Sequence, residues 1–158
     1  MKTFSIMILG LSWLLAGAAD DDKGLRKTAT IPAEWSDKVT DAAQLPVEQN
    51  DWGTLQWLCN GKVLPGAEQT VGLATILPGK RNPAHYHPNC EEVLYVISGQ
   101  GLQTYDGRTI TLKAGMTLRI PAKTKHNLVN TGAEPLRTLV SFSSGDRQTV
   151  WVGQQRAN

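Results

Sequence analysis

Hydrophobic positions after residue 50 fall in short runs, and each run stops at Gly, Pro, Asn-Gly or Asp-Gly. The runs are rich in β-branched, leucine and aromatic residues, and the residues between them favour tight turns. No segment in this part of the sequence keeps the helical hydrophobic period of about 3.6 residues over the length of a helix. The pattern therefore predicts an all-β domain, an antiparallel sandwich or closed barrel, with strands at 54–59, 70–77, 92–97, 104–105, 109–112, 116–120, 125–129, 136–142 and 148–152.

Residues 1–18 have the charge and hydrophobicity pattern that is typical of a signal peptide. Lys2 supplies a positive charge, residues 4–15 form an apolar stretch too short for a relaxed transmembrane span, and small residues then precede a polar segment. We predict that residues 1–18 are removed, with cleavage after Ala18 or Ala19, and that the mature protein is secreted or periplasmic. An uncleaved N-terminal anchor is the alternative.

Residues 19–50 are polar and weakly patterned, which predicts an arm with one short strand or helical turn at most. Residues 51–158 form the single predicted domain, and a hydrophobic content of 41% suffices for a core. The formal net charge is +2 and no long basic run occurs, so nothing indicates a nucleic-acid or anionic-membrane surface. We expect a small-molecule or protein partner, and no stable membrane span after signal cleavage.

The three histidines of the chain stand where a metal site would need them. His85 and His87 are two residues apart, so on a strand they point to the same side. Glu92 heads the apolar face of the next strand, where a carboxylate is costly unless it is paired or bound to a metal. His126 precedes Leu128 and Asn130 on one face of a later strand. Each residue alone has an ordinary explanation, as a satisfied core histidine or a solvent-facing carboxylate.

The segment 79–99 resembles the first motif of the cupin family, in which Gly is followed by His-x-His, then Glu, then Gly. Four residues separate Glu92 from His87 and six separate it from Gly99, which is the spacing of that motif. Glu91 would leave seven residues before Gly99. The register therefore selects Glu92 as the ligand and leaves Glu91 on the other face of the strand.

The segment 115–130 resembles the second cupin motif and contributes His126. It departs from the family pattern at Lys123, where the family usually has a turn glycine, so a strained φ or a different turn type is expected there. The resemblance as a whole covers about 72–142. The resemblance implies an antiparallel jelly-roll β-barrel with one divalent metal ion, either Mn, Fe, Co, Ni, Cu or Zn, on His85, His87, Glu92 and His126.

Family resemblance also implies a homodimer, in which the arm helps to cover the edges of the barrel. Four protein ligands leave two positions open on an octahedral ion, and one carboxylate against a dication favours anionic substrates. Redox chemistry of the dioxygenase or oxidase type is slightly favoured. The alternatives are a Lewis-acid isomerase, epimerase or lyase acting on a sugar or uronate, and a barrel that binds a small molecule or metal without catalysis.

No residue outside the four ligands is assigned a catalytic role. Lewis-acid chemistry needs a separate acid or base, and the sequence does not place the candidates Tyr86, Tyr95, Tyr105, Lys123 and Lys125. Arg119 either grips a substrate carboxylate or faces solvent, and Asn82 and Gln56 are weaker candidates. Cys59 and Cys90 either form a disulfide, which an exported protein permits, or remain separate thiols.

Overall fold

The computed structural model describes residues 30–153, of which 32–153 lie in one compact unit. The predicted signal peptide lies outside the described residues. Two short 3₁₀ turns, η1 (Ala33–Trp35) and η2 (Ala42–Gln44), precede the strands. The strands are β1 (Glu48–Asn50), β2 (Gly53–Cys59), β3 (Thr70–Ile76), β4 (His85–Tyr86), β5 (Glu92–Ser98), β6 (Gln100–Tyr105), β7 (Arg108–Lys113), β8 (Thr117–Ile120), β9 (His126–Asn130), β10 (Leu136–Phe142) and β11 (Val150–Trp151).

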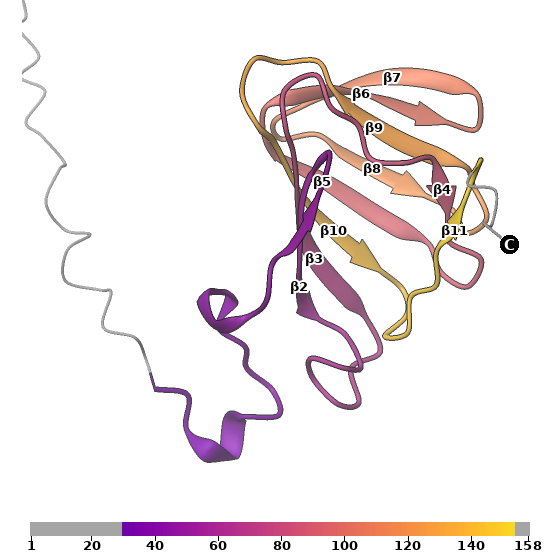
Figure 1. Ribbon diagram of the computed structural model, residues 1–158. Coiled ribbons are helices and arrows are strands. Elements are labelled where there is room, and N and C mark those ends of the chain that lie inside the picture. The colour runs from indigo at the N-terminus through magenta and orange to yellow at the C-terminus, as the bar shows by residue number, and fades with distance from the viewer. Residues whose placement is uncertain (1–29, 154–158) are drawn as a thin grey trace, which may run out of the picture. The chain divides into compact units, whose positions relative to one another are not determined.

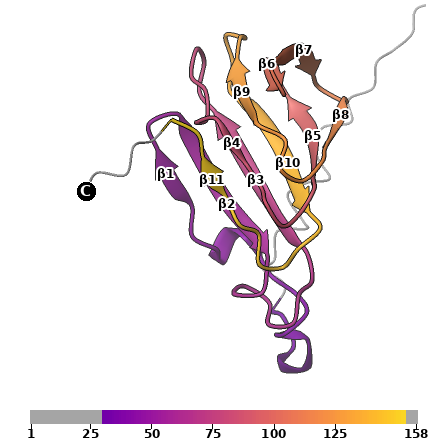
Figure 2. The same ribbon diagram turned by 90° about the vertical axis from the view of Figure 1, so that its right-hand side faces the viewer.

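The strands form two antiparallel sheets that face each other, as the two views in Figures 1 and 2 show. The first sheet has the order β1-β2-β3-β10-β5-β8, and the second has the order β11-β4-β9-β6-β7. Strand β10 lies between β3 and β5, and β9 lies between β4 and β6, so neighbours in a sheet are often distant in the chain. This is the jelly-roll arrangement that the cupin resemblance predicts, and the all-β fold is confirmed.

Alternation along the strands places one side of each sheet in the core. Burial alternates residue by residue along β3, β5 and β10, so that every second side chain points between the sheets. Full burial of one such aliphatic side chain contributes about 1.5–3 kcal/mol. The core cluster consists of Ile76, Cys90, Leu94, Val96, Leu112, Leu128, Leu136, Val140 and Phe142.

The arm extends the first sheet by one strand. Strand β1 pairs with β2 across a turn at 51–52, and it forms the edge of the sheet. Before it, the Thr40 hydroxyl donates to the Leu58 carbonyl oxygen at 2.9 Å, and Gln56 Nε2 donates to the carbonyl oxygens of Ala42 and Leu45 at 2.6 and 3.1 Å. Gln56 therefore holds the arm against β2, which is a structural role.

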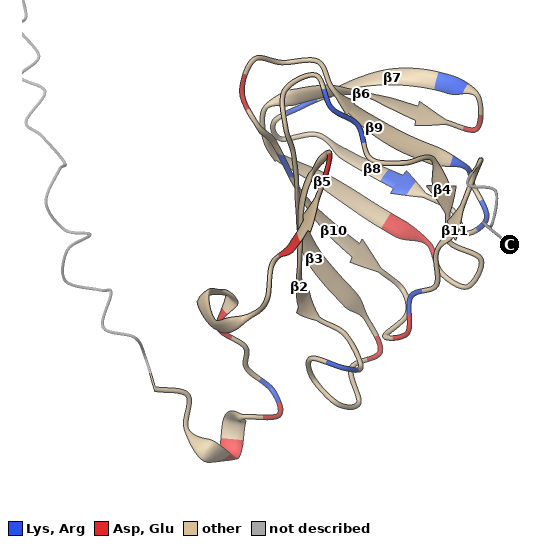
Figure 3. Cartoon of the chain, in the orientation of Figure 1, with Lys and Arg blue, Asp and Glu red and all other residues tan. Residues whose placement is uncertain are grey.

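The described part of the chain has mixed surface charges and no long apolar helix. Figure 3 shows basic and acidic residues interspersed over the described part of the chain, in agreement with the absence of a long basic run in the sequence. A search of the same residues found no helix with the length and hydrophobicity needed to span a membrane.

Lys123 adopts a positive φ, which is the first of the two alternatives left open for its place in the second motif. Its φ is 67°, a conformation in which Cβ crowds the following carbonyl of any residue except glycine. The Lys123 backbone N–H donates to the His87 carbonyl oxygen at 2.7 Å, so this turn of the second motif is tied to the first motif.

Replacement of Lys123 by glycine is therefore expected to stabilise the protein. The left-handed conformation costs a non-glycine residue about 1–2 kcal/mol, and the freedom of glycine in the unfolded chain offsets about 0.5–1 kcal/mol of that gain. We expect the free energy of unfolding in urea to rise by about 0.5–1 kcal/mol. Lys125→Gly is the control, because Lys125 has no positive φ and the change should destabilise. A destabilised Lys123→Gly variant would show that the lysine side chain stabilises the turn.

Candidate metal centre

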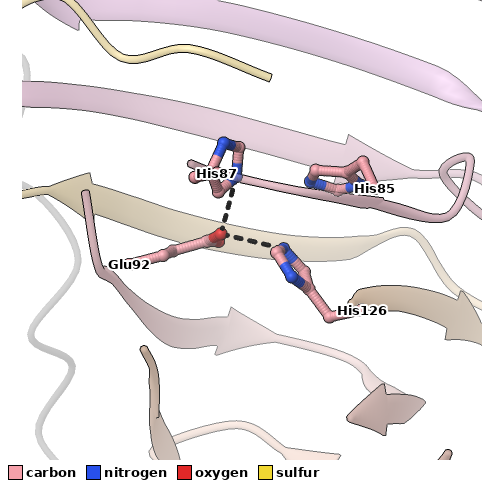
Figure 4. Close-up of side chains that lie close together, drawn as sticks. All are labelled: His85, His87, Glu92 and His126. Atoms are coloured by element: carbon pink, nitrogen blue, oxygen red, sulfur yellow. Dashed lines mark ion pairs between the residues drawn. The ribbon is translucent and has the colours of Figure 1, made fainter. Parts of the chain in front are cut away.

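The four predicted ligands meet between the two sheets. His85 of β4 and His126 of β9 are direct partners in the second sheet, whereas Glu92 begins β5 in the first sheet. His87 follows β4 on the segment that leads back to β5. Figure 4 shows the four side chains pointing toward one another. All four are buried, and their ligand atoms lie within 4.8 Å of one another.

Hydrogen bonds to backbone carbonyl oxygens determine the tautomer of each imidazole. The Nδ1 atoms of His85, His87 and His126 lie 2.8, 2.7 and 2.9 Å from the carbonyl oxygens of Pro83, Gln148 and Thr124. A carbonyl oxygen only accepts, so each Nδ1 carries the proton and each neutral ring keeps a lone pair on Nε2. All three imidazoles are therefore prepared to bind a cation through Nε2.

Three buried polar atoms at the point where the four side chains meet have no hydrogen-bond partner. Glu92 Oε2 lies 3.3 Å from His87 Nε2 and 3.1 Å from His126 Nε2, and none of these buried atoms has a partner of suitable geometry. Buried polar atoms without partners are costly. A divalent cation would satisfy the carboxylate and the lone pairs together, so the donor set fits a transition-metal ion.

Electrostatics keep the ligands in the states that a metal requires. Burial, helped by nearby His126, lowers the pKa of His85 to about 4, so this ring is neutral near pH 7. Burial alone would raise the pKa of Glu92, but the close approach of the His126 and His87 rings outweighs it and brings the pKa to about 2. Burial by itself would lower the pKa of His126, but the nearby Glu92 carboxylate raises it overall. A proton and a metal ion therefore compete for His126 Nε2.

A cavity of about 420 Å³ adjoins the four ligands. Its walls are mostly apolar, and Trp151 of β11 packs against the His85 ring with a centroid distance of 5.2 Å. Besides the ligands, its lining includes Glu48, Asn50, Trp52, Leu55, Trp57, Ala74, Ile76, Asn82, Pro83, Leu94, Gln103, Leu128, Thr138, Val140, Phe142, Arg147 and Trp151. A largely apolar pocket with a few polar groups is typical of a small-molecule site.

Arg119 does not line this cavity, so its possible role as a carboxylate-binding residue is not supported. Its Nη2 and Nε atoms lie 2.6 and 2.9 Å from Oε2 of Glu91 on the outside of the barrel, where the Arg119 side chain is 66% exposed. Glu91 faces away from the metal ligands, as the register to Gly99 indicates. Such an exposed ion pair contributes little to stability.

The other sequence candidates divide between the cavity and the surface. Asn82 lines the cavity, and its Oδ1 atom accepts from the Leu128 backbone N–H at 2.7 Å. Tyr95 is 40% exposed on the outer face of β5. The sequence offered five candidate acid–base residues, and none of them lines the cavity. They are Tyr86, Tyr95, Tyr105, Lys123 and Lys125.

Cys59 and Cys90 are free thiols, so the disulfide alternative is not realised. Cys90 belongs to the hydrophobic core, and burial raises the pKa of its thiol. Cys59 is partly exposed at the end of β2.

Gln103 and Arg147 are among the polar residues of the cavity that the sequence reasoning missed. Gln103 is fully buried on β6, and its Oε1 atom has no partner. Alternation in 100–105 puts Gln103 on the face opposite the apolar Leu102, so the sequence pattern gave no signal that Gln103 points inward. Arg147 lies in a polar segment between β10 and β11, which carries no motif that would have indicated its position.

Two antiparallel sheets that enclose three imidazoles and a carboxylate define a jelly-roll barrel of the metal-binding type. The Cupin domain family model matches residues 72–142. Together with the relatives described below, this match shows that the chain belongs to the cupin family.

Three known proteins are similar to this chain. Polyketide synthase CurC of Streptomyces cyaneus is 32% identical over 106 residues, 67% of this chain and 69% of that protein. Dimethylsulfoniopropionate lyase DddW of Ruegeria pomeroyi is 30% identical over 115 residues, 70% of this chain and 74% of the relative. A Bacillus subtilis oxalate decarboxylase structure, studied for its Mn(II) centres, superposes with a TM-score of 0.65 and 26% identity. That match covers 70% of this chain but only 31% of the decarboxylase.

Proposed function

We propose that this protein is a metal-dependent enzyme that acts on a small carboxylate. The convergence of three Nε2 lone pairs and the Glu92 carboxylate on one buried point carries this proposal. His85, His87, Glu92 and His126 would hold the ion, which would supply Lewis acidity and, for Mn, Fe, Co or Cu, electron transfer. Manganese is the first metal to test, because the similar decarboxylase has Mn(II) centres.

Charge and similarity support a carboxylate as the substrate. One carboxylate ligand against a dication leaves a positive site, which attracts anions and which the apolar cavity walls shield from water. Oxalate and dimethylsulfoniopropionate, the compounds in the names of two similar proteins, both carry a carboxylate. These observations support the anionic substrate that the ligand set predicts.

The lining of the cavity favours redox chemistry over a reaction that needs a protein base. Among the described lining residues, the titratable groups other than the four ligands are Glu48 and Arg147. Glu48 is exposed and accepts a hydrogen bond from Trp57 Nε1 at 3.0 Å. Arginine stays protonated and is a poor base. A lyase reaction remains the second candidate, favoured by the similarity to DddW, with Glu48 as the available base.

We also propose that the protein is exported and forms a homodimer. The basic start, apolar stretch and small residues of 1–18 support export. Support for a dimer comes from the outer face of β5, where Val93, Tyr95 and Ile97 are 37, 40 and 38% exposed. These three side chains form an apolar stripe that a second copy would cover.

The test of the proposed enzyme starts from protein purified without a metal-affinity column. We expect metal analysis to give about one equivalent of a first-row transition metal per chain. Protein loaded separately with Mn, Fe, Co, Ni, Cu and Zn is then incubated with oxalate, dimethylsulfoniopropionate and related carboxylates, while product formation and oxygen uptake are recorded. Carboxylate turnover with Mn or Fe, together with a dependence on oxygen, is the expected result.

The other outcomes have distinct meanings. Turnover without oxygen dependence, equally fast with Zn, would replace the redox proposal by the lyase candidate. Protein that keeps its metal but converts none of these carboxylates would contradict the enzyme proposal and leave a metal-binding barrel. Protein that binds no metal under any loading condition would contradict the whole proposal.

A further inference from the structure

Arg147 presents a buried donor without a partner inside the metal cavity. Its Nε atom is buried and has no hydrogen-bond partner, and the residue lines the cavity beside the metal ligands. The guanidinium carbon lies 4.5 Å from the centroid of the Trp57 ring and 5.1 Å from that of Phe142. Aromatic faces compensate a desolvated cation by about 0.5–2 kcal/mol, but they satisfy no N–H group.

The guanidinium and the metal ligands share one wall of the cavity. The Phe142 ring packs edge-on against His87, with a centroid distance of 4.8 Å, and it also lies beneath Arg147. The Thr149 hydroxyl contacts Arg147 Nη1 and lies 3.4 Å from His87 Nδ1. A small molecule in the cavity can therefore reach a metal ion and the Arg147 guanidinium together.

The segment that carries Arg147 is held in place by the turn after His87. The Asn89 side chain donates to the Asp146 carbonyl oxygen at 2.8 Å and accepts from the Gln148 N–H at 3.0 Å. The Gln148 carbonyl oxygen in turn accepts from His87 Nδ1 at 2.7 Å. The loop that orients His87 thus also positions Arg147, which makes the guanidinium a built part of the site.

A positive charge at this place needs an anion. Burial lowers the pKa of Arg147, although the nearby charge of Glu92 opposes this effect, and an arginine stays charged at neutral pH. No carboxylate of the described residues lies within ion-pair distance of its guanidinium. A partly buried cation without a counter-ion is unfavourable, and a guanidinium binds a carboxylate through parallel hydrogen bonds.

We propose that Arg147 binds the substrate carboxylate. This inference rests on the proposed metal site, and it adds a second anchor to it. The substrate class that fits is a small organic acid with two oxygen-bearing ends, one of which faces the metal while the other accepts hydrogen bonds from Arg147. Oxalate is the simplest probe of this class, and formate, with a single carboxylate, is the matched shorter probe.

The experiment measures anion binding to the full chain loaded with Mn(II), by calorimetry with oxalate and formate. Arg147→Met removes the charge and keeps an apolar stem over Trp57 and Phe142. We expect its dissociation constant for oxalate to rise by about 10- to 100-fold, because a hydrogen bond to a charged group contributes about 1.5–3 kcal/mol. Formate affinity should change less, and Mn content should stay near one equivalent. Arg119→Met, which removes the exposed arginine, should bind oxalate as the unmodified protein does.

Three results would overturn this inference. If Arg147→Met binds oxalate as tightly as the unmodified protein, the arginine only packs on the aromatic rings. If the unmodified protein holds Mn(II) but binds neither anion, the carboxylate subsite is wrong while the metal site stands. If no metal binds, the proposed function itself fails. Should Arg147→Met not fold, Arg147→Lys keeps the charge without the planar fork, and unchanged oxalate affinity in that variant would also contradict the proposal.

Discussion

Replacement of Glu92 by glutamine is expected to reduce metal affinity by more than about 100-fold. Removing a residue that only hydrogen-bonds to a metal ligand typically costs about 10–100-fold, and loss of a ligand itself should cost more. Glu92 supplies the one negative charge of the cluster and lies 3.1 and 3.3 Å from two of the three Nε2 atoms. The variant should still fold, since the glutamine amide has nearly the same shape and can donate to His87 or His126. Metal content after dialysis measures the effect, and His126→Ala should show the same loss.

The matched control for this prediction is Glu91→Gln. Glu91 is the preceding residue, but it pairs with Arg119 on the outside of the barrel. This variant should keep one equivalent of metal, and its stability should change by less than about 1 kcal/mol. Loss of metal in Glu91→Gln but not in Glu92→Gln would mean that the register of β5 is wrong. Metal retained in both variants would place the ion elsewhere in the protein.

Metal binding should also appear in thermal stability. A ligand that binds only the folded state at about 100 times its dissociation constant adds about 2.7 kcal/mol. A chelator should therefore lower the melting temperature of the unmodified protein, whereas Glu92→Gln should show the same melting temperature with and without the chelator. Equal chelator effects in both proteins would contradict the assignment of Glu92 as a ligand.

Replacement of Asn130 by alanine is expected to lower the free energy of unfolding by about 2–4 kcal/mol, because several buried groups lose their partners. Asn130 is 1% exposed. Its Nδ2 atom donates to the carbonyl oxygens of Ile76 and Glu134, both at 2.8 Å, and its Oδ1 accepts from the Gly132 N–H at 2.9 Å. One side chain thus joins the end of β3 to the turn after β9.

Urea unfolding measures this loss, and Asn127→Ala serves as the control. Asn127 lies on the same strand with only partial burial, so its replacement should change stability by no more than about 0.5 kcal/mol. The folded fraction of Asn130→Ala should still bind one metal ion, because the four ligands lie outside this turn. A loss below about 1 kcal/mol would show that water replaces the asparagine in the turn.

Local alternation and turn residues were sufficient for most of the fold, and the two cupin-like motifs selected the four residues that meet between the sheets. The β5 segment shows why: Glu92, Leu94 and Val96 share one face in the sequence pattern, and all three are buried in the structure. A strand alternates with a period of two whatever its neighbours are, so the face of each side chain follows from sequence position alone. The positive φ of Lys123 was predictable for a similar reason, because the turn type is a local property.

The sequence by itself determined the β-rich class, the inward face of each main strand and, through the two motifs, the four residues of the candidate metal site. The tertiary structure decided which arginine belongs to the cavity. Arg119 was the sequence candidate, but its strand points it outward to Glu91, whereas Arg147 reaches the cavity from a segment without regular pattern. Its position depends on hydrogen bonds to Asn89, which lies far away in the sequence. Contacts of that kind form only when the chain closes on itself, so periodicity within a segment carries no information about them.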